Sequence, residues 1–81
     1  MITGYFKHFK GGIYRVICEA VHSETQEEMV VYQNLPSKKI WVRPKRMFLD
    51  KVFRDGKYYQ RFTPIDEVEA LKIVELIIKN L

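Results

Sequence analysis

The chain has 81 residues, of which 47% are hydrophobic and 14% aromatic, and it carries a net charge of +4 at neutral pH. That length fits one domain with one compact core, and the apolar content excludes a disordered chain. No stretch reaches the ~18 apolar residues of a membrane span, and Lys7, His8 and Lys10 interrupt the region where a signal peptide would be apolar. Because Cys18 is the single cysteine, no intrachain disulfide can form, and a reducing cytoplasm is the expected location.

Charge is distributed unevenly along the chain. Residues 1–62 contain 12 Lys and Arg and 6 Asp and Glu, whereas residues 63–81 contain 2 and 4. The body is therefore basic, at +6, and the C-terminal segment is mildly acidic, at −2. A basic body favours polyanionic partners such as RNA, DNA or anionic lipid, and the alternative is a surface kept soluble by mixed charge.

A hairpin is expected directly after Gly11 and Gly12. Alternation predicts a half-buried strand over residues 14–20, with one side formed by Tyr14, Val16, Cys18 and Ala20. The polar residues 22–27 form a connection, and residues 28–32 form a second, antiparallel strand. On this pattern Cys18 is a buried, inert thiol.

The next strand, residues 40–43, follows a loop at residues 34–39 and ends at Pro44, which has no N–H for a ladder. Alternation places Trp41 and Arg43 on one side and Ile40 and Val42 on the other. We expect Ile40 and Val42 to form the core pair, which leaves Trp41 partly exposed.

The second half of the chain has clear local signals. One helical turn within residues 44–51 directs Met47 and Phe48 inward. Asp55-Gly56 between two apolar runs predicts a two-residue hairpin turn, because both turn positions need positive φ. The expected core combines Tyr14, Val16, Val30 or Val31, Val42 and Phe48.

A C-terminal amphipathic helix is expected from Thr63, as N-cap, and Pro64, at the first helical position. Its apolar stripe consists of Ala70, Leu71, Val74, Ile77, Ile78 and Leu81, while Leu76 falls in the polar sector. Several short strands in a small chain favour a closed antiparallel barrel, because closure removes exposed edges. The predicted fold is thus mainly β, with a barrel over residues 1–63 and a helix over residues 64–81 that packs on the barrel or on a partner.

Several short motifs occur in order along the first part of the chain. They are His8-Phe9-Lys10-Gly11-Gly12-x-Tyr14, His22-Ser23-Glu24-Thr25, Val30-Val31-Tyr32, Trp41-Val42-Arg43-Pro44, Met47-Phe48, Asp55-Gly56 and Arg61-Phe62. Together they resemble a small bacterial domain family of unknown function, over about residues 4–65. The resemblance implies an SH3-like barrel but no established activity. The loop at residues 34–39 departs from the family pattern, and the helix after Ile65 is an addition.

Trp41 lies in the most basic stretch of the sequence. Around it are Lys38, Lys39, Arg43, Lys45 and Arg46, and no acid occurs between Glu28 and Asp50. An exposed ring among cations suits single-stranded nucleic acid, because bases stack on the ring while cations hold phosphates. The alternative is that Trp41 belongs to the core and the cations form a solvated face.

Tyrosines offer a second interpretation. Tyr5, Tyr32, Trp41 and Tyr58 would line a groove for a peptide or cage a methylated cation.

The motif His22-Ser23-Glu24-Thr25 is either functional or a turn whose side chains satisfy backbone groups. The ligand-binding candidates are therefore Tyr32, Trp41, Arg43, Lys45, Arg46 and His22.

The sequence favours a small cytoplasmic binding module for RNA or another anionic partner over an enzyme. The alternative is a protein-interaction or peptide-binding domain that homodimerises through the C-terminal helix. No catalytic residue is predicted, because neighbours in sequence rarely provide the spatial arrangement that catalysis requires. No metal, cofactor or membrane partner is predicted either.

Overall fold

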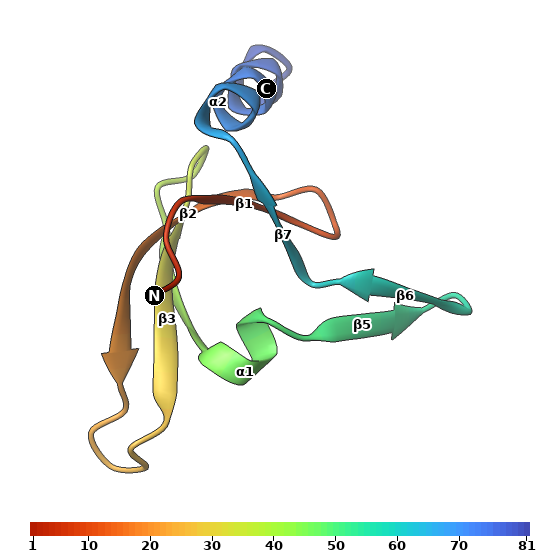
Figure 1. Cartoon of the computed structure of the whole chain (residues 1–81). Coiled ribbons are helices and arrows are strands. Elements are labelled where there is room, and N and C mark those ends of the chain that lie inside the picture. The colour runs from red at the N-terminus through yellow and green to blue at the C-terminus, as the bar shows by residue number, and fades with distance from the viewer.

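The computed structural model describes residues 1–81, and its elements are shown in Figure 1. They are β1 (Tyr5–His8), β2 (Ile13–Val21), β3 (Glu28–Asn34), β4 (Ile40–Pro44), α1 (Lys45–Phe48), β5 (Lys51–Arg54), β6 (Lys57–Gln60), β7 (Phe62–Ile65) and α2 (Glu67–Lys79). An antiparallel five-stranded sheet has the order β4-β3-β2-β1-β7, and β5 and β6 pair only with each other, forming a separate ribbon. The expected mainly β fold with a C-terminal helix is confirmed.

The strands do not close into the expected barrel. Because β5 and β6 pair with neither β4 nor β7, both sheet edges stay open. The base of the ribbon is held by Arg61, whose N–H donates to the Asp50 carbonyl at 3.0 Å and whose Nε lies 2.7 Å from Asp50 Oδ1. From this base the ribbon projects away from the sheet (Figure 1), so it cannot bridge the two edges.

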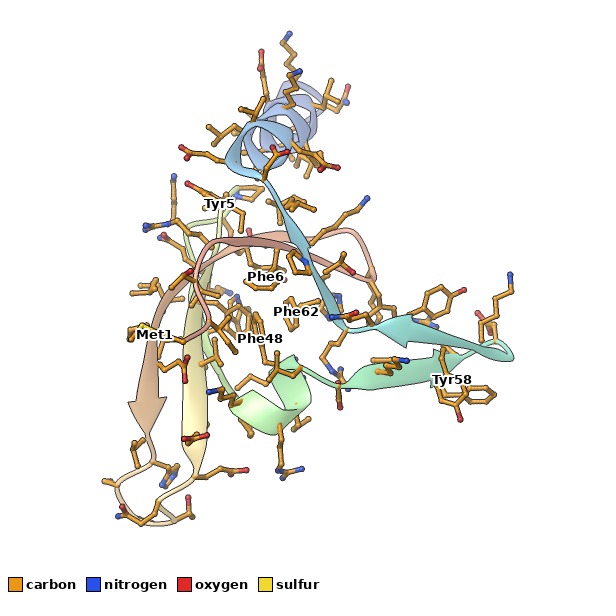
Figure 2. The ribbon with its side chains drawn as sticks, in the orientation of Figure 1. Met1, Tyr5, Phe6, Phe48, Tyr58 and Phe62 are labelled. Carbon is orange, nitrogen blue, oxygen red and sulfur yellow. The ribbon has the colours of Figure 1, made fainter.

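The main core lies on one face of the sheet, which we call the inner face. Phe48 and Phe62 stack at 4.2 Å, and the Phe6 ring meets Phe48 edge-on at 5.1 Å. Figure 2 shows these three rings gathered between the sheet and α1, and Val16, Val30 and Tyr32 complete the buried cluster. The prediction that Val16, Val30 and Phe48 are buried together is therefore confirmed, and Tyr14 packs against them.

The predicted alternation in β4 is correct, but its assignment to the core is wrong. Tyr32 pairs with Trp41 and Val30 with Arg43, so Trp41 and Arg43 share the inner face with two buried residues. Ile40 and Val42 lie on the opposite, outer face and are 59% and 60% exposed. The buried side of this edge strand is set by β3 and not by the hydrophobicity of its own residues.

Cys18 is exposed, which contradicts the prediction of a buried thiol. The register of β2 against β3 shifts between Val16 and Cys18, as at a β-bulge. The extra residue, Ile17, ends the simple alternation, so Cys18 pairs with Val31 on the outer face.

The C-terminal segment differs from the prediction at its start. Thr63 and Pro64 belong to β7, which pairs with β1, and the helix is capped by Asp66, whose Oδ1 accepts from the Glu69 N–H at 2.8 Å.

Helix α2 packs on the outer face over β1 and β2, where Ile13 and Ala70 are fully buried. In Figure 2, Tyr5 lies on this side and Phe6 on the other. No helix of the chain has the length and apolarity that a membrane crossing requires.

Candidate functional site

Beside the core, the inner face carries a group of polar and aromatic side chains from four neighbouring strands. We call His8, Tyr14, Tyr32, Trp41 and Arg43 the inner-face cluster. The Tyr14 ring lies 5.3 Å from Tyr32, and the His8 ring lies 5.0 Å from Phe62. The preceding turn leaves room for Tyr14, because a Cβ on Gly12 would lie 2.8 Å from its ring. Antiparallel pairing thus assembles residues that are far apart in sequence.

Arg43 carries a charge that no carboxylate of the chain neutralises. Its Nε donates to the Tyr32 hydroxyl at 3.2 Å, and its guanidinium carbon lies 6.0 Å from the Phe62 ring centroid. The neighbouring cations are paired differently, since Lys45, Arg46 and Arg61 each contact a carboxylate. The guanidinium nitrogens that do not contact Tyr32 keep donors for an anionic ligand, and arginine stays charged at all physiological pH values.

His8 adds no second charge to this cluster at neutral pH. Burial lowers its pKa, and the positive charges of Arg43, Arg61 and Lys10 lower it further. Its Nδ1 accepts from the Lys10 N–H at 3.2 Å, which assigns the proton of the neutral ring to Nε2. The imidazole therefore offers one donor and no charge.

Trp41 presents an accessible ring. It is 47% exposed and takes part in none of the ring–ring contacts that join Tyr14, Tyr32, Phe48 and Phe62. The Lys39 ammonium lies 5.5 Å from its ring centroid, within cation–π range. An aromatic surface and an exposed cation thus occur together at the sheet edge.

Lys45 and Arg46, two of the residues expected to bind ligand, are held in ion pairs. Lys45 Nζ lies 2.9 Å from Glu19 Oε1, and Arg46 Nε lies 3.0 Å from Glu27 Oε2. The Lys45 contact lowers the pKa of Glu19, and the Glu19 contact raises the pKa of Lys45. Both cations line a shallow hollow with Glu27, Glu28 and Leu49. Their charges are therefore largely neutralised within the chain.

His22 lies in the turn between β2 and β3, not in the inner-face cluster. Its Nδ1 accepts from the backbone N–H groups of Glu24 and Thr25 at 3.2 and 3.3 Å. The Thr25 hydroxyl in turn accepts from the Glu27 N–H at 3.2 Å. Figure 1 shows this turn at the projecting end of the hairpin. The motif satisfies backbone groups here, as the structural alternative expected.

Of the six expected ligand-binding residues, the structure brings Tyr32, Trp41 and Arg43 together. His8 and Tyr14 were not among them. The period-two spacing of Phe6 and His8 was the available signal, but a strand as short as β1 is recognisable only beside its partners. No three His, Cys, Asp or Glu side chains come close enough together to hold a metal ion.

A family model described as protein of unknown function (DUF1653) matches residues 4–64. A crystal structure of a DUF1653 protein from Bordetella bronchiseptica has 26% sequence identity and a TM-score of 0.72, covering 82% of this chain and 88% of that chain. No curated protein matches. The inner-face cluster lies within the matched residues, whereas α2 lies beyond them.

Proposed function

The chain belongs to the DUF1653 family of proteins of unknown function, and we propose that it is a binding module whose inner face takes single-stranded nucleic acid. One observation carries the proposal. Trp41, half-exposed, and Arg43, without a carboxylate partner, lie on the same face of β4.

A ligand for this surface needs both a flat ring and negative charge. Single-stranded nucleic acid offers both, because its bases are unpaired and its phosphates are charged. A base stacked on Trp41 would bring a phosphate toward Arg43, with Lys39 beside the ring as a further cation. Lys45 and Arg46 have smaller parts in this proposal, because a phosphate would have to compete with Glu19 and Glu27.

The test uses Trp41 as its own reporter, since the chain has one tryptophan. Titration with short RNA and DNA strands at two salt concentrations should quench its fluorescence, and higher salt should weaken binding. Arg43→Gln should weaken binding of all sequences alike, and Arg43→Lys should recover part of it. Arg46→Gln is the matched control, because it removes a cation that is already ion-paired. Absence of quenching at low salt, or equal effects of the Arg43 and Arg46 variants, would refute the proposal.

A second candidate function is protein interaction through α2. Leu71, Leu76 and Ile78 are 50%, 60% and 53% exposed on this helix, so its docking on the sheet leaves apolar side chains in contact with water. Sedimentation of the full chain tests it. A monomer at all concentrations would count against a homodimer through α2.

Three broader features are also proposals. A bacterial origin is supported by the Bordetella structure, and a cytoplasmic location by the exposed, unpaired Cys18, which a reducing compartment keeps as a thiol. A relationship to SH3-like barrels is supported by short antiparallel strands packed on one aromatic core. Superposition on SH3-like barrels tests the last of these.

A further inference from the structure

The β5–β6 ribbon stands apart from the rest of the chain. Its strands pair only with each other, and Figure 1 shows it projecting from the body. An isolated two-stranded hairpin is marginally stable in water. Here the Asp50–Arg61 contact holds its base, and the Tyr59 ring stacks on Phe9 at 6.1 Å. The side of the ribbon that carries Tyr59 is therefore the one that docks.

The opposite side of the ribbon is an exposed aromatic surface. Phe53 pairs with Tyr58, their rings lie 4.8 Å apart, and they are 61% and 73% exposed. Figure 2 shows Tyr58 pointing away from the body. A cross-strand pair of this kind adds only about 0.2–1 kcal/mol to a hairpin. Two polar residues would hold the hairpin nearly as well, so this much exposed aromatic surface needs a further explanation.

Positive charge lies on both sides of the ribbon. The register places Lys51 on the side of the aromatic pair, while Arg54 and Lys57, which pair with each other beside the turn, lie on the side of Tyr59. Residues 51–60 contain Lys51, Arg54 and Lys57 against the single acid Asp55, a net charge of +2. None of these side chains is in an ion pair. An arm with exposed rings and free cations is complementary to an anionic partner that carries flat groups.

We propose that the ribbon is a second contact for the same nucleic-acid strand that the inner face takes, an inference that rests on the proposed function. Phe53 and Tyr58 stack on bases, while Lys51, Arg54 and Lys57 contact phosphates. The longest extent of the molecule is 42 Å. At about 3.4 Å per stacked nucleotide, a strand of about 12 nucleotides reaches both contacts, whereas one of about three reaches only the inner face.

The experiment compares oligonucleotides of these two lengths by quenching of Trp41. The double variant Phe53→Ser, Tyr58→Ser should bind the short strand like the unmodified chain. Its affinity for the long strand should fall at least about tenfold, because two stacking contacts are lost. The matched control, Val21→Ser with Val68→Ser, removes similarly exposed side chains outside the ribbon and should bind both lengths normally.

A triple variant keeps the test decisive if the aromatic variant does not fold. Lys51→Gln, Arg54→Gln and Lys57→Gln leave the rings in place. For the long strand they should reduce the salt dependence of log affinity by about two, since each phosphate contact contributes about 0.7. An unchanged salt dependence for the long strand would overturn the second contact.

The outcomes separate the two proposals. Normal quenching by short strands, with no loss of long-strand affinity in the aromatic variant, would overturn the ribbon inference and leave the inner face standing. No quenching at any length would overturn the proposed function itself. If sedimentation shows a dimer that Phe53→Ser and Tyr58→Ser dissociate, the ribbon is an interface between copies, and the nucleic-acid inference is overturned.

Discussion

The two faces of the five-stranded sheet are built from the same alternating strands but have different contents. The inner face packs Phe6, Phe48 and Phe62 into one aromatic core, whereas α2 covers only part of the outer face. Local hydrophobicity does not account for this, because Val42 lies exposed on the outer face whereas Arg43 lies on the inner face. The difference shows that a face becomes the core where another element packs on it, here α1, which brings the fully buried Phe48 against β3 and β4.

The largest expected effect is the loss of a ring from the inner face. Phe48→Ala should lower the free energy of unfolding by about 3–5 kcal/mol, because a fully buried ring that contacts three others is removed. Val42→Ala on the outer face should change it by less than about 0.5 kcal/mol. Chemical denaturation of both variants is the measurement. Equal losses would contradict the contrast between the faces.

The next largest effect concerns the covered part of the outer face. Ile13 is fully buried there, so Ile13→Ala should cost about 2–4 kcal/mol by denaturation. Truncation after Ile65 would expose the same site, and we expect the two losses to be similar in size. A truncated chain as stable as the intact one would show that α2 adds nothing to the outer face.

The ribbon belongs to neither face, and a smaller, local effect is expected there. Asp55 and Gly56 have φ values of 53° and 77°, which confirms the predicted hairpin turn. Gly56→Val should cost about 1 kcal/mol or more, because a β-branched residue resists positive φ. Hydrogen exchange should localise the loss to residues 51–60. Lys57→Val, one position further, is the control and should show no such loss.

The smallest effect is a pH dependence of the inner face. Because the pKa of His8 is lowered, the unfolded chain takes up this proton first as pH falls below the ordinary value of 6.5. We therefore expect the free energy of unfolding to decrease as the pH falls below 6.5. Protonated His8 would add charge beside Arg43, so oligonucleotide affinity should rise as stability falls. His8→Gln should remove both trends, and His22→Gln should preserve them. A pH profile that His8→Gln leaves unchanged would exclude this role.

Much of the fold was predictable where the signal was local. The β2–β3 hairpin, the Asp55-Gly56 turn and the inward Phe48 each depend on a few adjacent residues. Thr63-Pro64 has the residue types of a helix start. Pairing with β1 instead holds these residues in an extended strand, so the helix begins later, with Asp66 as its N-cap. A pairing across such a distance leaves no local signal.

Prediction of the candidate site was limited in the same way, because contacts between residues far apart in the chain leave no local signal. Trp41 was expected to be partly exposed, and it is, but it lies on the inner face and not, as expected, on the side away from the core. The ion pair of Lys45 with Glu19 joins residues 26 positions apart, so no local pattern in the sequence indicated that Lys45 is paired. His8 was missed as a neighbour of Arg43, because the strands that carry them are not adjacent in the sheet.

The open sheet leaves two edge strands, β4 and β7, and each contains a proline. Pro44 ends β4, and Pro64 lies within β7. Unpaired edges are templates on which strands from other molecules can assemble into aggregates. A proline interrupts such growth, because it cannot donate the hydrogen bond that the incoming strand needs. The two prolines should therefore allow a sheet that never closes to remain dispersed at high concentration.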